Sequence, residues 1–376
     1  MNYLLNLFHT RHLDAVCRIP IREILFQSAD YSKSGQVELP EILPTLCRLK
    51  ELGKTVIFDF DILVKDHQLN RIANTLGAYT EYLDAIRFMD PGVGLCLKEH
   101  FPDMALHLIL EFRGFNRPSI NNWVREFLPG LRRVVLSNQL PVPGLRSIVP
   151  QLPVASELLG CGRIEVFYSA RHLIHPYFPQ KDDNCMELIC ASEDRPRQLS
   201  PLIENKHGTL MYYDKDLYIL NAKEELTQTG IKHLRLELYS DEQYETLAEC
   251  YPNLDWENHL LNHWQIKTTR GFFRTNKTHV PLKRLSNKFL KAEQKNKIGV
   301  VLESVKKNHI VFELLQPIDL PIALLIFSPE GEKVEFELKE VKTLNGKSSS
   351  KRLQSDYYLM PWIKHVVPAS VITPKN

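Results

Sequence analysis

Short segments rich in β-branched and aromatic residues alternate with segments of helical spacing through about the first 240 residues. Strands are predicted at residues 21–27, 55–60, 84–89, 104–110, 132–137, 163–168 and 233–238. Helices are predicted over residues 118–127 and over residues 39–53, where Leu43, Leu46, Leu49 and Leu52 share one side. Alternation repeated this often predicts a parallel sheet covered by helices. Six or seven such units approach the eight of a closed barrel, so we expect an α/β fold, a (β/α) TIM-like barrel; a doubly wound open sheet is the alternative.

The alternation is interrupted twice. Residues 169–221 contain histidines, two close cysteines and several prolines, and are predicted to form an insertion in a barrel domain of residues 1–275. Residues 276–297 are predicted to be a basic linker, because nine lysines and arginines between Arg270 and Lys297 face one acid, Glu293. Residues 298–376 then alternate as strands do, with SPEG (328–331) as a turn, which predicts an appended small antiparallel β-barrel.

Composition limits the class of protein. Lys plus Arg number 47 and Asp plus Glu 45, so nucleic-acid binding would have to depend on a local basic patch. A hydrophobic content of 44% excludes a disordered chain. The seven cysteines are odd in number and loosely spaced, and no apolar run is long enough for a membrane span. We therefore expect a reduced, cytoplasmic protein that makes no membrane contact.

Several standard motifs are missing from the chain. It has no GxGxxG after a strand, no GxxxxGK[ST], no HExxH and no GxSxG. Dinucleotide-binding folds, zinc peptidases of the HExxH type and α/β-hydrolases therefore lose support.

Seven segments carry a resemblance together. They are ELGKTVIF (51–58), RRVVLSNQL (132–140), GRIEVFY (162–168), HGTLMYYDKDLYIL (207–220), GIKHLRLELYS (230–240), TRGFF (269–273) and the C-terminal strand region. In this order and spacing they resemble the collagenase-like peptidase family of unknown catalytic type, peptidase family U32. The family's name implies proteolysis. Its better-explained members hydroxylate tRNA wobble uridine or a ribosomal RNA cytidine with prephenate, or serve oxygen-independent ubiquinone hydroxylation. The C-terminal region resembles the elongation-factor-like module of the tRNA-hydroxylation branch.

The resemblance implies a [4Fe–4S] cluster held by four cysteines, and here the chain departs from the family. Three of the ligand positions fall near Leu173 and Gln180 and at Tyr218, and only the remaining region keeps thiols, Cys185 and Cys190. Two thiolates cannot hold a cluster that requires four. We therefore expect no iron–sulfur cofactor.

A zinc site is an alternative use of the remaining thiols. His172 and His175 precede Cys185 and Cys190, and two imidazoles with two thiolates suit tetrahedral zinc. The competing interpretation is two ordinary thiols and two solvent-facing histidines.

Three carboxylates match acidic positions of the family and are the candidate catalytic residues: Glu165, Asp216 and Glu237. Glu165 lies in a predicted barrel strand and would point into the barrel or at its rim, or pair with an arginine such as Arg163 or Arg235. Asp216 lies in a turn that enters a predicted helix and could be its cap. Glu237 ends a strand, where catalytic groups of (β/α) barrels stand. The family's Lys-Ile-Glu-Gly-Arg is here RLELY (235–239), so its arginine, a carboxylate-binding fork, is lost.

The basic stretch is the candidate RNA-binding element. Its basic residues, interleaved with phenylalanines, could contact a phosphate backbone, and those we single out are Arg270, Arg274, Lys283, Arg284, Lys288 and Lys291. A solvated linker is the alternative. The sequence thus leaves three hypotheses: RNA (tRNA) base modification of the prephenate-dependent hydroxylation type or a diverged relative of it, a collagenase-like peptidase, and a non-catalytic protein partner of a cluster-bearing paralogue.

Overall fold

The computed structural model describes residues 1–112, 114–178, 185–192, 195–274, 296–329 and 331–375. The chain divides into two compact units, Met1–Asn276 and Lys277–Asn376, and each is described by itself. No helix among these residues is long and apolar enough to cross a membrane.

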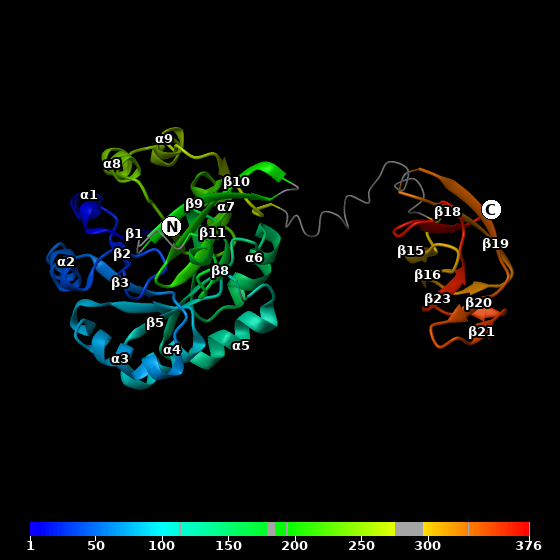
Figure 1. Ribbon diagram of the computed structural model, residues 1–376, viewed down its shortest axis with the longest axis horizontal. Coiled ribbons are helices and arrows are strands. Elements are labelled where there is room, and N and C mark those ends of the chain that lie inside the picture. Colours follow the sequence, from blue (N-terminus) through cyan, green and yellow to red (C-terminus); the bar gives the residue numbers. More distant parts are fainter. Residues whose placement is uncertain (113, 179–184, 193–194, 275–295, 330, 376) are drawn as a thin grey trace. The chain divides into compact units, whose positions relative to one another are not determined.

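Eight parallel strands of the first unit close into a ring (Figure 1). Each pairs in parallel with its neighbour, and the last pairs with both the first and the seventh. The strands are β1 (Asn2–Leu7), β2 (Glu23–Phe26), β3 (Thr55–Phe60), β4 (Ala85–Phe88), β5 (Ala105–Ile109), β6 (Leu131–Val135), β7 (Ala155–Gly162) and β13 (His233–Leu236). The predicted TIM-like barrel is therefore confirmed, and the open sheet is excluded.

Helices lie outside the ring of strands (Figure 1). They are α1 (Leu13–Arg18), α2 (Leu39–Glu51), α3 (Leu69–Gly77), α4 (Pro91–His100), α5 (Arg117–Phe127), α6 (Val142–Ile148), α7 (Lys223–Thr227), α8 (Asp241–Cys250) and α9 (Trp256–Asn262). Both predicted helices are confirmed. The buried face of α2 differs from the prediction: Ile42, Leu46 and Leu49 are buried, whereas Leu43 and Leu52 are exposed. A strict three-residue spacing drifts around a helix of 3.6 residues per turn.

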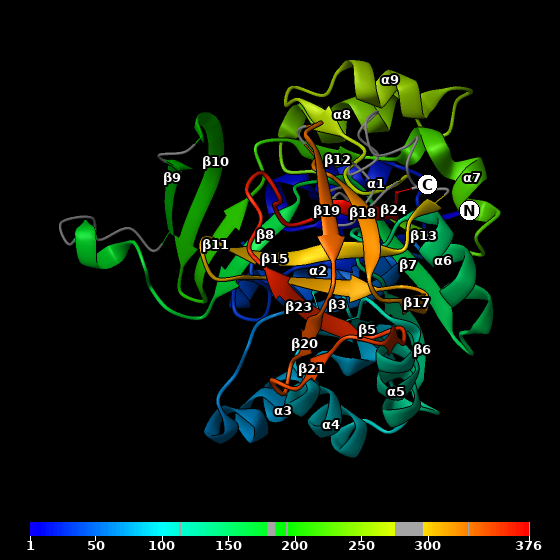
Figure 2. The ribbon, with the colours of Figure 1, turned by 90° about the vertical axis from the view of Figure 1, so that its right-hand side faces the viewer.

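A separate four-stranded antiparallel sheet interrupts the barrel after β7. It consists of β8 (Glu165–Ser169), β9 (Cys185–Ser192), β10 (Arg195–Asn205) and β11 (Gly208–Tyr212), in the order β8-β11-β10-β9 (Figure 2). The chain returns through β12 (Asp216–Tyr218), which pairs with β7 and with β14 (Thr268–Thr269). We call β8–β11 the inserted sheet.

Two predictions for this region were wrong. The strand expected at 163–168 is β8 of the inserted sheet, not a barrel strand, and β7 takes its place in the ring. The reason is burial: parallel barrel strands are covered on both faces, whereas Val166 and Phe167 of β8 are exposed. Asp216 lies in β12 rather than in a turn that enters a helix.

The second unit is a curled eight-stranded antiparallel sheet in the order β19-β18-β24-β15-β16-β23-β20-β21. Its strands are β15 (Gly299–Val305), β16 (His309–Leu314), β18 (Ile322–Phe327), β19 (Lys333–Leu338), β20 (Val341–Thr343), β21 (Ser348–Ser349), β23 (Tyr357–Pro361) and β24 (Val371–Pro374), and β17 (Ile318–Asp319) pairs with β22 (Arg352–Leu353). Alternate residues such as Ile310, Phe312 and Leu314 face its core. The expected antiparallel strands are confirmed, and β19 and β21 do not pair among the described residues.

Candidate active site

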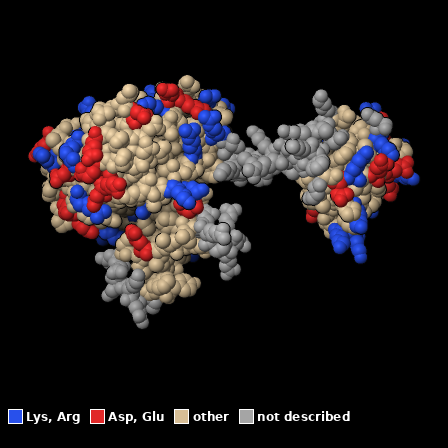
Figure 3. Space-filling view, turned by 90° about the horizontal axis from the view of Figure 1, so that it is seen from above, with Lys and Arg blue, Asp and Glu red and all other residues tan. Residues whose placement is uncertain are grey.

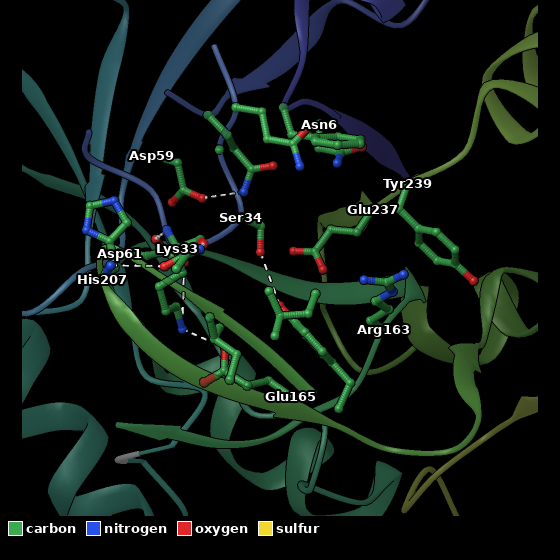
Figure 4. A pocket seen from close by; sticks show the side chains of 18 of the residues that line it. Asn6, Lys33, Ser34, Asp59, Asp61, Arg163, Glu165, His207, Glu237 and Tyr239 are labelled. Carbon is green, nitrogen blue, oxygen red and sulfur yellow. Dashed lines mark hydrogen bonds and ion pairs between the residues drawn. The ribbon is translucent and has the colours of Figure 1, made fainter. Parts of the chain in front are cut away.

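A cavity of about 440 Å³ lies where the barrel strands end and the inserted sheet covers them (Figure 4). Asn6 of β1, Asp59 of β3 and Glu237 after β13 line it from the barrel, and Glu165 and Tyr212 line it from the inserted sheet. The carboxyl ends of the strands are the face on which (β/α) barrels carry their active sites. The cavity is therefore the candidate active site.

A network of buried charges includes two arginines that line the cavity, Arg87 and Arg235. Glu157 of β7 lies 3.0 Å from Arg87, 3.1 Å from Arg133 and 3.2 Å from Arg235. Burial alone would raise the pKa of Glu157, but the three guanidinium groups lower it to about 2. Glu157 is thus a fixed negative charge that orients three arginines from three different strands.

Arg235 links this network to the predicted residue Glu237. Its guanidinium lies 2.6 Å from Glu111 and 2.7 Å from Glu237. Burial raises the pKa of Glu237, and Arg235 opposes that rise. The expected position of Glu237 at the end of a strand is confirmed, and its catalytic role stays a prediction.

Asp59 is a carboxyl group that sequence reasoning missed. Gln27 donates a hydrogen bond of 2.9 Å to Asp59 Oδ2, and Arg87 Nε lies 3.5 Å from Oδ1. Burial and the charge of Asp61 raise the pKa of Asp59 to about 7. A carboxyl group with this pKa can give or take a proton near neutral pH. The alternation FDFD (58–61) at a strand end was the signal that could have found it.

Glu165 pairs with a lysine rather than with the expected arginine. Lys33 Nζ lies 2.6 Å from Glu165 and 3.6 Å from Asp61, and both carboxylates are largely buried. Burial raises the pKa of Glu165 and Lys33 opposes it. The arginine partner was predicted from a barrel position that Glu165 does not occupy. The pair instead joins the loop after β2 to the inserted sheet.

Further bonds hold the inserted sheet to that loop. Asn205 donates to the carbonyl of Lys33 at 2.7 Å, and His207 Nε2 lies 2.6 Å from the carbonyl of Ala29. Lys206 pairs with Asp30 at 2.6 Å. The cover of the cavity is thus fixed by contacts to one loop.

Asp216 lies outside the cavity lining, and its catalytic role stays a prediction. Its Oδ2 accepts a hydrogen bond of 2.8 Å from Trp264 Nε1 and another from the hydroxyl of Tyr239. Asp216 therefore supports Tyr239, which does line the cavity.

Each of the four residues of the alternative zinc site is exposed or contacts another group. Cys185 is exposed on β9, and Cys190 Sγ contacts the carbonyl of Ser200 at 3.4 Å. The ring of His172 lies 3.8 Å from Glu204, and His175 is exposed in the following turn. Among the described residues, no three His, Cys, Asp or Glu side chains gather as a metal site would require.

The ligand positions implied for the cluster do not fit a four-thiolate centre. The side chain of Leu173 is 43% exposed and apolar. Tyr218 is buried, and its hydroxyl donates to the carbonyl of Glu257. Gln180 lies outside the described residues. The chemistry of these side chains disagrees with the cofactor that the resemblance implies.

Of the candidate RNA-binding residues, two are described. Arg270 donates to Asn221 at 3.3 Å, and Arg274, 72% exposed, lies 3.6 Å from Glu225. Lys283, Arg284, Lys288 and Lys291 lie outside the described residues. On the face of the first unit seen in Figure 3, charges of both signs are interspersed.

Comparison with known proteins identifies relatives over part of the chain. The tRNA hydroxylation protein P of Escherichia coli (strain K12) is 24% identical over 202 residues, covering 41% of this chain and 44% of that protein. The tRNA hydroxylation protein P2 of Bacillus subtilis (strain 168) is 29% identical over 177 residues, covering 43% and 55%. The chain spans about half the length of these curated relatives. The solved structure of the U32 peptidase Mk0906 is similar at a TM-score of 0.37 and 13% identity, covering 43% of this chain and 70% of that one.

The profile of peptidase family U32 matches residues 33–292, which include the barrel from β3 onward and the inserted sheet. This match confirms the resemblance seen in the segments. Because it covers well over half of the chain, the protein belongs to peptidase family U32.

Proposed function

We propose that this chain takes part in the modification of tRNA by hydroxylation, of the prephenate-dependent type or a diverged form of it, with the barrel cavity as the site of chemistry. The observation that carries the proposal is the cavity of a U32 barrel that places Asp59 and Glu237 on one lining. The relatives named tRNA hydroxylation proteins supply the reaction class.

The cavity residues suit proton transfer beside a small bound molecule. A volume of about 440 Å³ lies in the range of sites for small organic ligands. Asp59 has a pKa of about 7, so it can hold or release a proton, while Glu157 and Arg235 stay charged. These fixed charges are buried and preorganised, and charges act most strongly where water is excluded from them.

Mass spectrometry of tRNA nucleosides tests the proposal. A strain that lacks this protein should lose a hydroxylated uridine, and the wild-type chain should restore it. Asp59→Asn and Glu237→Gln should restore less than about a tenth, because proton transfer by a positioned group contributes at least 10²-fold. Glu126→Gln, at an exposed position of α5, should restore it fully. Unchanged nucleosides in the deletion strain would refute the proposal.

A second candidate, the non-catalytic partner of a cluster-bearing paralogue, is favoured by Leu173 and Tyr218 at ligand positions. Affinity capture of the tagged full chain followed by mass spectrometry tests it: a stoichiometric U32 paralogue is expected, and its absence argues against the idea. The peptidase alternative gains no support from the cavity, since His207 directs Nε2 to the carbonyl of Ala29 rather than to a serine or cysteine.

A further inference from the structure

Arg163, between β7 and β8, stands out among the cations that line the cavity. The others each lie 3.3 Å or less from a carboxylate: Arg11, Lys33, Arg87, Lys206 and Arg235. For Arg163, no ion pair or hydrogen bond of the guanidinium is found within the described part of the chain. Its side chain is partly buried, so this lining cation is held in the cavity without an ion pair to any residue described here.

Two tyrosine rings fix the direction of this guanidinium. Arg163 Cζ lies 4.3 Å from the ring centroid of Tyr239 and 5.5 Å from that of Tyr212. Aromatic rings offer the cation no oxygen acceptor, so the N–H groups of the guanidinium keep their capacity to bind a carboxylate. The rings are themselves held, because Tyr239 donates to Asp216 and Tyr212 contacts Ser34 Oγ at 3.1 Å. The arginine is therefore preorganised before any ligand binds.

The backbone explains why the side chain reaches this place. Gly162 ends β7 at φ +136°, and a Cβ there would lie 2.6 Å from Cβ of Glu237. This close approach brings Arg163 to the same side of the cavity as Glu237 and Tyr239, across from Lys33, Asp61 and His207 (Figure 4).

We propose that Arg163 anchors the carboxylate of a small organic acid in the cavity; this inference rests on the proposed function and names the group that recognises its small-molecule substrate. A planar carboxylate matches the two parallel N–H groups of a guanidinium. A phosphate dianion fits less well, because Arg163 is the one cation without an ion pair among the lining residues that the structure describes, and Glu165 and Glu237 line the same cavity. The apolar side chains of Phe8 and Leu159 suit a hydrocarbon body beyond the carboxylate.

Binding of three matched probes to the full chain tests the proposal. Benzoate, benzamide and phenyl phosphate share one ring and differ in the head group: a carboxylate, a neutral amide and a dianion. Titration calorimetry and ligand-observed NMR should show benzoate bound more tightly than the other two. Arg163→Gln should weaken benzoate about 10- to 100-fold, as expected for a bidentate charged pair, and leave benzamide unchanged. Arg171→Gln, at an exposed position of the insertion outside the cavity lining, should bind as the wild type does.

Three outcomes would overturn the proposal: benzoate that binds Arg163→Gln as well as the wild type, phenyl phosphate that binds more tightly than benzoate, or no benzoate binding at millimolar concentration. Circular dichroism should show both variants folded. The nucleoside assay separates this proposal from the function. Arginine-dependent benzoate binding with unchanged nucleosides in the deletion strain would support the anchor and refute the tRNA role. Loss of the hydroxylated uridine in that strain, with benzoate binding that does not depend on Arg163, would support the tRNA role and refute the anchor.

Discussion

Lys33 joins the inserted sheet to the loop after β2 through a buried ion pair with Glu165. Burial alone would lower the pKa of its ammonium group, but Glu165 and Asp61 raise it, so the lysine stays charged. Removing one partner of a buried pair leaves an uncompensated charge, which costs about 3–5 kcal/mol. We expect Lys33→Met to lower the free energy of unfolding by about 3 kcal/mol, measured by urea denaturation.

Lys206→Ala is the matched control for this change. Lys206 pairs with Asp30 and joins the same loop to the inserted sheet, but its side chain is 50% exposed. Exposed pairs contribute about 0–1 kcal/mol. Equal losses in the two variants would contradict the view that burial of the Lys33–Glu165 pair sets its importance.

Asp59 should make the stability of the protein depend on pH. Its pKa is raised from 3.8 to about 7, so the folded chain holds a proton that the unfolded chain has released between these values. This stabilisation is complete below about pH 4 and is lost as the pH rises through 7. Between pH 5 and 7 the wild type should lose about 2 kcal/mol more unfolding free energy than Asp59→Asn. Urea denaturation at the two pH values measures this, with Asp103→Asn at an exposed loop position as control. Parallel losses in wild type and Asp59→Asn would contradict the assignment.

At the scale of elements, periodicity predicted the closed barrel but missed β1 and β7 among the strands that form it. Strands such as β3, TVIFDF, and β5, ALHLI, are short and mostly apolar, and their type was readable from the residues alone. The strand β7, ASELLGCG, contains two glycines and a buried glutamate, so its local preference argues against a strand. Tertiary packing overrides that preference, since Glu157 is matched by three arginines that arrive from other strands. The neighbouring strand β8 has residues typical of a strand, and its prediction as a barrel strand is wrong.

Gly162 gives a direct test of how β7 and β13 are packed. A φ of +136° is unfavourable for any residue that has a side chain. A methyl group on the Cα of Gly162 would also lie only 2.6 Å from Cβ of Glu237. We expect Gly162→Ala to cost roughly 3 kcal/mol, from strain and overpacking together. Gly53→Ala, at φ +67° with nothing within 4 Å, should cost about 1 kcal/mol from strain alone. Thermal and urea unfolding of both variants would show the difference. Equal losses of unfolding free energy would mean that the backbone at Gly162 and Glu237 moves apart at little cost.

At the scale of the whole molecule, the site combines residues that the sequence keeps far apart. Glu237 was predictable, because a carboxylate at a strand end carries a meaning in a (β/α) barrel. Lys33 was not, since its partner Glu165 becomes a neighbour only when the insertion folds over the barrel. Asp59 had only the alternation FDFD as a signal, because its partner Arg87 comes into place through the pairing of β3 with β4. A local sequence pattern predicts whether a residue lies in a helix or a strand. Its role in the site depends on charged partners that are distant in the sequence.

The basic stretch is the feature of the whole chain that remains a prediction from sequence. If it binds an RNA backbone, each lysine or arginine that neutralises a phosphate releases counterions, so affinity should fall steeply with salt. Replacing Lys283, Arg284, Lys288 and Lys291 with alanine should weaken binding to total tRNA across sequences and flatten the salt slope by roughly one unit per lost contact. Alanine at four exposed lysines of the second unit, Lys306, Lys333, Lys342 and Lys347, removes the same charge and should change the slope less. Filter binding at several salt concentrations decides the matter: equal slopes for wild type and the first variant would make the stretch a linker only.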